Sequence, residues 1–230
     1  MNVRPHRTCK TLFFAGTDTD VGKTYVAALV AQALAQTGQR VGVYKPVASG
    51  CHRSETELVA DDARHLWIAA GRPGRLDDVC PQRFEAALAP PEAAKRESRQ
   101  VDASLLRSGA QCWETDSEVL IVEGAGGLLS PLANDVLNVD LVRQFSPVRL
   151  IIVAANRLGA VHQTLSTIEA SLYRGIRPDA IVLSNVTDRP DESAQTNLRQ
   201  IANYSDVPVL GPIRYEATRL DGQILQQLCG

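Results

Sequence analysis

The fold is decided by the stretch Phe13-Phe14-Ala15-Gly16-Thr17-Asp18-Thr19-Asp20-Val21-Gly22-Lys23-Thr24. The apolar run at 11–15 predicts a buried strand, and residues 25–36 have the three- and four-residue apolar spacing of a helix. Backbone N–H groups between a strand and a helix N-terminus can surround phosphate oxygens. The stretch therefore predicts a phosphate-binding loop, in which Lys23 contacts the β- and γ-phosphates and Thr24 holds Mg²⁺.

The loop is a variant of the common motif. Five residues separate Gly16 from Gly22, one more than is usual between the first glycine and the Gly-Lys pair. A chance Gly-Lys-Thr in a surface turn is the alternative, and the strand before the loop and the helix after it count against that alternative.

Length and composition are those of an ordinary α/β domain. The 230 residues are 44% hydrophobic and 22% charged, with a net charge of −2. This balance predicts no nucleic-acid surface and no membrane partner. There is no apolar run of the ~18 residues that a spanning helix needs, and residues 1–10 lack the apolar core of a signal peptide. We expect a single domain over 1–230 in the cytoplasm, with residues 1–9 flexible.

The cysteines are odd in number and widely spaced. They are Cys9, Cys51, Cys80, Cys112 and Cys229, without a Cys-x-x-Cys pair. Free thiols in a reducing compartment are the expected state.

A second short strand at 41–44 leads into Lys45-Pro46-Val47-Ala48-Ser49-Gly50. Lys45 and Ser49 thus follow the carboxyl end of a strand, where open α/β sheets bind ligands. A solvated surface lysine is the alternative reading of Lys45. The neighbouring proline and glycine favour a ligand loop, because they fix the backbone and reduce side-chain cover.

Residues 54–71 show a helical pattern with Asp61-Asp62 near its start. Carboxylates in a first turn favour the helix dipole, and this accounts for one of the two. Mg²⁺ sites on nucleotides also draw on protein carboxylates, so Asp62 is a candidate ligand. The Pro-rich stretch at 71–100 is expected to be a long connection with short helices, lying near the substrate site.

A helix is expected at 102–113, followed by a fully apolar strand at 119–122 that runs into Glu123-Gly124-Ala125-Gly126-Gly127. An acidic residue ending a buried strand is costly unless it is paired or on a metal. In phosphate-loop proteins such a residue contacts Mg²⁺. A plain exit from strand to turn is the alternative.

Strands and helices alternate through the rest of the chain. Strands are expected at 150–154, 180–183 and 207–210, and helices at 160–173 and 191–203, with a loop at 211–215 and then a terminal helix that ends at Cys229. This alternation predicts an α/β, P-loop NTPase-like fold with a mostly parallel sheet and helices on both faces.

Taken together, the motifs around Lys23, Lys45 and Glu123 resemble those of the dethiobiotin synthetase family over nearly the whole chain. The resemblance implies an ATP-dependent ligase of biotin biosynthesis. Its substrates are 7,8-diaminononanoate, CO₂ (or bicarbonate) and ATP, and its products are dethiobiotin, ADP and phosphate. The diamine forms a carbamate, ATP phosphorylates the carbamate, and the second amine closes the ureido ring.

The resemblance also implies roles for particular residues. Lys23 and Lys45 would be catalytic, neutralising charge on the γ-phosphate and the carbamate, and Thr19 and Ser49 would lie near the diamine. Mg²⁺ would be held by Thr24, Asp62 and Glu123. The implied ATP-binding residues are Asp20, Val21, Gly22, Lys23, Thr24, Tyr25, Asp62, Glu123, Gly124, Ala125, Gly126, Asn185, Arg214 and Tyr215.

The implied assembly is a homodimer with the substrate near the subunit interface. The stretch Arg157-Leu158-Gly159 resembles the segment that presents a helix N-terminus to the partner's substrate carboxylate. The chain departs from its relatives at His162, where they have asparagine, so the charge of that contact would depend on pH. It also departs at Val186 and in the Arg214-Tyr215-Glu216 loop.

Three alternatives remain at this stage. A switch-type ATPase of the same superfamily would carry an extra lysine early in the loop, where this chain reads Gly16-Thr17-Asp18. An amidotransfer-type ligase would need a glutaminase Cys-His partner domain. A homologue that binds nucleotide without catalysis is the third, since a fold alone does not fix a function.

Overall fold

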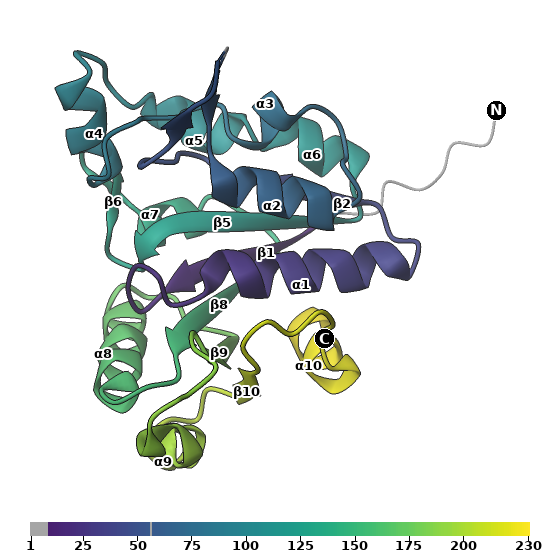
Figure 1. The fold of residues 1–230 in the computed structure, drawn as a ribbon, viewed down its shortest axis with the longest axis vertical. Coiled ribbons are helices and arrows are strands. Elements are labelled where there is room, and N and C mark those ends of the chain that lie inside the picture. The colour runs from purple at the N-terminus through teal and green to yellow at the C-terminus, as the bar shows by residue number, and fades with distance from the viewer. Residues whose placement is uncertain (1–8, 56) are drawn as a thin grey trace.

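The computed structural model describes residues 9–55 and 57–230, and its centre is a six-stranded parallel sheet with the order β10-β9-β8-β1-β5-β2 (Figure 1). All neighbouring strands of this sheet run parallel. The α/β, P-loop NTPase-like architecture predicted from the sequence is confirmed. The strands are β1 (Lys10–Gly16), β2 (Val41–Tyr44), β5 (Val119–Gly127), β8 (Val148–Ala155), β9 (Ala180–Ser184) and β10 (Val209–Ile213).

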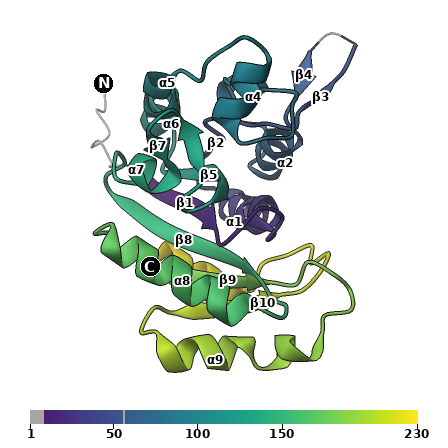
Figure 2. The same ribbon diagram turned by 90° about the vertical axis from the view of Figure 1, so that its left-hand side faces the viewer.

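Helices cover both faces of the sheet. Figure 2 shows α1 and α2 on one face and α7 and α8 on the other. Their bounds, with those of the two C-terminal helices, are α1 (Lys23–Gln36), α2 (Asp61–Ala69), α7 (Asn138–Val142), α8 (Ala160–Tyr173), α9 (Asn197–Tyr204) and α10 (Gly222–Cys229). Strands covered in this way are apolar along their whole length, which explains why continuous apolar runs predicted them.

The strand that leads into the phosphate loop is at the centre of the core. Leu12, Phe13, Phe14 and Ala15 are fully buried in β1, and the Phe13 ring lies 6.2 Å from the ring of Phe145. This burial fixes the position at which the loop leaves the sheet. The expected flexible segment 1–9 lies outside the described residues, except for Cys9, which is buried.

The helix expected at 54–71 begins later than predicted. The chain first forms a hairpin of β3 (His52–Arg53) and β4 (Leu58–Val59), in which Ser54 N donates to Glu57 O at 2.8 Å. Only then does α2 begin, at Asp61. Leu58 and Val59 fit the apolar spacing of a helix, but they occupy the second strand of the hairpin, and short apolar runs do not distinguish the two states.

The expected connection at 71–100 does contain short helices, α3 (Leu76–Val79) and α4 (Pro90–Arg96). Part of it runs along the edge strand β2 and the residues that follow β2. Lys45 N donates to Val79 O at 2.7 Å, and Ala48 pairs with Arg83 in a parallel bridge. The backbone of Lys45 is therefore held by this connection.

The single helix expected at 102–113 is two helices, α5 (Ala103–Ser108) and α6 (Gln111–Asp116). They meet at Gly109, a residue that weakens helices. A Cβ at Gly109 would lie 2.3 Å from the Tyr44 hydroxyl, which donates to Leu105 O at 2.7 Å. The close packing of Tyr44 therefore requires glycine at position 109, although almost any other residue would stabilise a continuous helix better.

Smaller differences follow further along the chain. Strands β6 (Pro131–Ala133) and β7 (Val136–Leu137) form a hairpin that was not predicted. The helix expected at 191–203 is a 3₁₀ turn, η1 (Glu192–Gln195), followed by α9. Strand β10 extends to Ile213, into the expected loop. Two- and three-residue strands carry too little periodic signal to be recognised from sequence.

Among the described residues, no helix is long and apolar enough to cross a membrane. The five cysteines are unbonded, as expected, and differ in exposure.

We predict that Cys112, the exposed cysteine, reacts first with a thiol reagent at about pH 8. Cys80 is buried, and burial raises its pKa to about 12, so little thiolate forms there before unfolding. The measurement is the time course of thiol labelling in native protein. A fast phase that survived in the Cys112→Ser variant would contradict the assignment.

Candidate functional site

A cleft of about 1170 Å³ opens where the strands β1, β5 and β9 end. In Figure 1 these carboxyl ends point to the left, where α1 begins. The cleft brings together most of the residues singled out in the sequence: Thr19, Asp20, Gly22, Lys23, Thr24, Tyr25, Lys45, Ser49, Asp62, Glu123, Ala125, Gly126, Asn185 and Tyr215. Three others, Val21, Gly124 and Arg214, are not part of its lining.

The phosphate loop is held closed by packing that excludes side chains at its glycines. A Cβ on Gly16 would lie 2.6 Å from the backbone oxygen of Asp18. Gly22 has φ +89°, and a Cβ there would lie 2.7 Å from Ser184 Oγ. Val21 is buried beneath the loop at 1% exposure, which explains its absence from the cleft. The loop backbone is thus packed closely against its own residues and against Ser184.

Lys23 lies in the first turn of α1, and its side chain reaches back to the backbone of the loop. Its Nζ donates to Asp18 O at 3.0 Å, and the side chain is buried. Burial lowers the pKa of Lys23, an effect that Glu123 opposes. Anionic phosphate oxygens at this position would stabilise the charged form, because an opposite charge nearby favours ionisation.

A buried ion cluster lies beside the loop. Lys45 Nζ donates to Glu123 Oε1 at 2.7 Å and to Asp62 Oδ2 at 2.8 Å. Thr24 Oγ1 also donates to Glu123 Oε1, at 2.8 Å. Lys45 directly follows β2, Glu123 lies in β5 and Asp62 lies in α2, so three segments distant in sequence meet here. The sequence predicted each residue separately.

The charges of this cluster support one another. Burial alone would lower the pKa of Lys45. The negative charges of Glu123 and Asp62 have the larger effect, so the pKa of Lys45 is raised. The Lys45 ammonium in turn lowers the pKa of Asp62. Burial raises the pKa of Glu123, and Lys45 opposes that rise. Lys45 is therefore a fixed cation at the cleft wall, not the solvated surface lysine of the alternative reading.

The same residues offer oxygen ligands suited to a hard cation. The carboxylates of Asp62 and Glu123 and the hydroxyl of Thr24 lie around one position, and Glu123 Oε2 is buried without a hydrogen-bond partner among residues 9–55 and 57–230. Mg²⁺ prefers one or two protein carboxylates and fills its other positions with water and phosphate oxygens. This donor set fits the Mg²⁺ expected from the sequence.

The Asn138 side chain forms hydrogen bonds with the backbone of the glycine-rich end of β5. This residue was not identified from the sequence. Its side-chain nitrogen donates to Ala125 O at 2.7 Å and Gly127 O at 2.8 Å. A Cβ on Gly124 would lie 2.1 Å from Asn138 Oδ1, so Gly124 packs against Asn138 and not into the cleft. The available signal was a polar residue inside the apolar run at 136–142.

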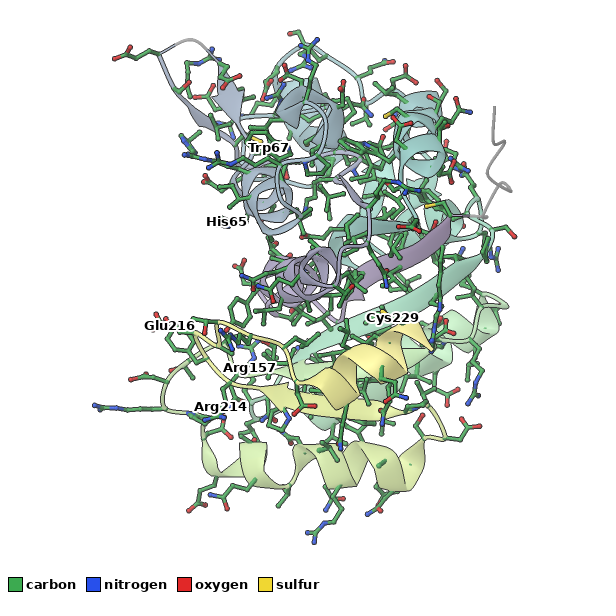
Figure 3. The ribbon with its side chains drawn as sticks, turned by 90° about the vertical axis from the view of Figure 1, so that its right-hand side faces the viewer. His65, Trp67, Arg157, Arg214, Glu216 and Cys229 are labelled. Carbon is green, nitrogen blue, oxygen red and sulfur yellow. The ribbon has the colours of Figure 1, made fainter. Side chains whose placement is uncertain are left out.

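The opposite end of the cleft is formed by α1 and the loop after β10. Tyr25 Oη donates to Ala217 O at 2.7 Å and also lies 3.2 Å from Arg214 O, so Arg214 contributes its carbonyl there. Figure 3 shows His65 of α2 and Glu216 of this loop on opposite sides of α1. Ser184 also lines this end, and within the described part of the chain its buried hydroxyl has no hydrogen-bond partner.

The side of the cleft near Thr19 and Ser49 is bordered by the long connection. Residues 87–90 line it, together with Ser130 and Pro131 at the start of β6. The lining within this chain does not include Arg157, Leu158, Gly159 or His162. Those residues lie before and at the start of α8, and all four are exposed.

Comparison with known proteins identifies the family. A family model described as an AAA domain matches residues 10–219. The chain is 44% identical over 212 residues to a Rhodopirellula baltica protein named ATP-dependent dethiobiotin synthetase BioD, covering 88% of this chain and 83% of that protein. A Bacillus cereus protein of the same name is 37% identical over 199 residues, covering 86% and 81%.

Solved structures support the fold alone. The signal recognition particle receptor FtsY from Elizabethkingia anophelis superposes with a TM-score of 0.53 at 17% identity, covering 98% of this chain and 68% of that one. The chloroplast FtsY from Physcomitrella patens gives a TM-score of 0.54 at 16% identity, covering 99% and 66%. The sequence relatives are far closer and extend over most of both chains, and the chain belongs to the ATP-dependent dethiobiotin synthetase family.

Proposed function

We propose that this protein is an ATP-dependent dethiobiotin synthetase that joins 7,8-diaminononanoate and CO₂ at the expense of ATP. The observation that carries the proposal is the buried Lys45 ammonium, held by Glu123 and Asp62 beside a preformed phosphate loop. A fixed cation between a phosphate site and an open acceptor pocket suits phosphoryl transfer to an anionic acceptor, since such transfer depends on positioning and charge neutralisation.

The chemistry balances without a covalent enzyme intermediate. One amine of the diamine adds to CO₂ and loses a proton, giving a carbamate. A carbamate oxygen attacks the γ-phosphorus, and the bond from that phosphorus to the bridging oxygen of ADP breaks. The second amine then attacks the carbamate carbon, phosphate leaves with its oxygen, and the amine gives up a proton. The products are dethiobiotin, ADP and phosphate.

Residues of the chain have distinct parts in this proposal. Lys23 binds the β- and γ-phosphates, while Lys45 neutralises charge shared by the γ-phosphate and the carbamate. Thr19 and Ser49 border the pocket where the diamine would lie. The preformed loop and the buried cluster would cost little reorganisation when the transition state forms, which is how fixed dipoles and charges lower barriers.

Thr24, Asp62 and Glu123 would hold Mg²⁺, which supplies charge neutralisation on the phosphates when bound. The partnerless Glu123 Oε2 supports this assignment. We expect Glu123→Gln to shift the Mg²⁺ dependence of the reaction to higher concentrations, about 10-fold or more, because a neutral amide is a weaker ligand. Titrating activity with Mg²⁺ measures the shift. A wild-type Mg²⁺ profile in the variant would remove Glu123 from the ligand set.

We further propose a homodimer in which α8 faces the partner and the helix N-terminus near His162 approaches the partner's substrate carboxylate. Support comes from apolar side chains exposed along α8 and just before it. Leu158 is 80% exposed and Tyr173 is 89% exposed. Leu172, next to Tyr173, is 41% exposed, and adjacent exposed apolar side chains form the kind of patch that marks an interaction site.

The expected result for Leu158→Asp is a loss of dimer mass in sedimentation and a rise in KM for the diamine, with KM for ATP unchanged. A matched control is Tyr204→Asp, which changes an exposed aromatic residue on α9 that is 72% exposed. A Leu158→Asp protein that sediments as wild type would contradict the proposed interface.

The decisive experiment measures phosphate release from ATP and Mg²⁺, with and without the diamine plus bicarbonate, and checks the product mass. Release that needs both additions, with the mass of dethiobiotin, supports the synthetase. Release indifferent to the diamine would indicate a switch-type ATPase, and no release a binding protein. The unbonded cysteines are compatible with a cytoplasmic enzyme.

A further inference from the structure

Behind the cleft wall near β9, three asparagine side chains form a continuous hydrogen-bonded chain. Asn185 follows β9 and lines the cleft. Asn156 follows β8 and Asn197 begins α9, and these two are 2% and 3% exposed. Figure 2 shows that β8, β9 and α9 lie together on this side of the molecule. The function proposed above assigns no role to Asn156 or Asn197.

The direction of this chain of hydrogen bonds is set by two backbone carbonyls. Asn197 Nδ2 donates to Arg157 O at 3.1 Å and to Asn156 Oδ1 at 3.0 Å. Asn156 Nδ2 donates to Ala194 O at 3.2 Å and to Asn185 Oδ1 at 2.9 Å. A carbonyl oxygen can only accept, so the amide nitrogens of Asn197 and Asn156 must face Arg157 O and Ala194 O.

The orientation of Asn185 follows from this. Because Asn156 offers it a donor, Asn185 must turn its oxygen toward Asn156, and its nitrogen then lies on the other side of the amide. Within the described part of the chain, Asn185 Nδ2 has no hydrogen-bond partner. The backbone is also fixed, since Asn156 N donates to Ser184 O at 2.8 Å and Asn185 N donates to Ile213 O at 2.9 Å.

We propose that Asn156 and Asn197 are positioning residues that lock the amide of Asn185 and thereby make the base site select adenine over guanine. The inference rests on the proposed function and on Asn185, an ATP-binding residue implied by the family resemblance, meeting the nucleotide base where it lines the cleft. A locked amide presents one donor, Nδ2, and one remaining acceptor lone pair, on Oδ1. Adenine offers the complementary pair, the N7 acceptor and the N6 amino donor.

Guanine does not fit the locked amide. It presents acceptors at both N7 and O6, so its O6 would meet Asn185 Oδ1 lone pair to lone pair. The NH₂ group of Asn185 carries two hydrogens, so an amide free to rotate could place this group between O6 and N7, donate to both and remove the repulsion. Discrimination therefore depends on the lock as well as on Asn185 itself, and removing the lock should affect ATP and GTP unequally.

Two variants of Asn156 test this in graded fashion. Leucine, of similar shape, makes no hydrogen bonds and frees the amide of Asn185. Aspartate still accepts from Asn197 but cannot donate, so the Asn185 amide would reverse and donate to it. We expect the ratio of ADP to GDP affinity to fall about 10-fold in Asn156→Leu and further in Asn156→Asp, since a bidentate base contact discriminates against the wrong base on this scale.

The measurement is calorimetric titration of the full chain with ADP and with GDP in the presence of Mg²⁺. Ser171→Ala is the matched control, because it removes a buried hydrogen bond to Ile176 O far from the cleft and should leave the ratio unchanged. If Asn156 has only a structural role, its replacement will weaken the binding of ADP and of GDP equally. That result would overturn the inference. If Asn156→Asp does not fold, Asn156→Leu alone decides.

The binding of ADP and GDP can be measured without the synthetic reaction, so the failure of this inference can be distinguished from the failure of the proposed function. A protein that binds ADP in preference to GDP but makes no dethiobiotin would refute the proposed function and leave the lock supported by the variants. A wild-type protein without preference for ADP, or without nucleotide binding, would overturn the lock whatever its activity.

Discussion

Replacing Lys45 by alanine is expected to lower turnover about 1000-fold, the scale on which single fixed charges contribute to acyl and phosphoryl transfer. Affinity for ATP should change far less, because Lys23 and the loop backbone remain. The reason is that Lys45 is placed to meet charge that develops during transfer. Steady-state kinetics combined with equilibrium binding of ADP separates the two effects.

Stability must be separated from catalysis in this variant. Removing Lys45 leaves Glu123, which is 1% exposed, with one partner fewer in the core. Loss of one member of a buried ion pair costs about 3–5 kcal/mol. The double variant Lys45→Ala/Glu123→Gln removes the stranded charge, so it should recover part of the thermal stability and none of the turnover. A normal turnover number in Lys45→Ala would exclude Lys45 from the mechanism.

The second large effect is expected at Gly22. Gly22→Ala should weaken nucleotide binding about 100-fold, because its Cβ would lie 2.7 Å from Ser184 Oγ and push the phosphate loop away from the sheet. Several loop N–H contacts to phosphate would be misplaced together, and each charge-assisted hydrogen bond is worth roughly 1.5–3 kcal/mol. Titration with ADP gives the affinity directly.

Gly38 provides the matched control. It has φ +83°, close to the φ of +89° at Gly22, but a Cβ there meets nothing within 4 Å. Gly38→Ala should therefore carry the same backbone strain, on the order of 1–2 kcal/mol, without a steric clash or a loss of nucleotide binding. Equal binding losses in the two variants would show that strain alone, and not the clash with Ser184, is responsible.

The parts of the site that could be predicted share one property. Lys23, Lys45 and Glu123 each stand next to a continuous apolar run that reads as a buried strand, and the ends of parallel strands gather at one edge of the sheet. Local sequence therefore located them. It could not show that Lys45 and Glu123 touch, because their contact joins residues 78 positions apart.

The residues that were missed are determined by tertiary contacts. Asn156 and Asn197 are 41 positions apart, and in sequence each is an ordinary polar residue near an element end. The early start assigned to α2 failed for a related reason. Leu58 and Val59 match helical spacing, yet pairing with His52 and Arg53 decides their conformation. The periodic spacing of apolar residues does not show which strand a segment will pair with.

The connection between β2 and β5 has a consequence for how this protein could diversify. The wall beside Thr19 and Ser49 includes residues 87–90 of that connection together with Ser130 and Pro131, whereas the wall around Tyr25, Asn185 and Tyr215 comes from other parts of the chain. On the proposed function, residues 87–90 can therefore vary without changing the residues at the nucleotide end. Exchanging residues 87–90 between homologues should alter preference for the diamine while Asp62 and the nucleotide contacts stay intact.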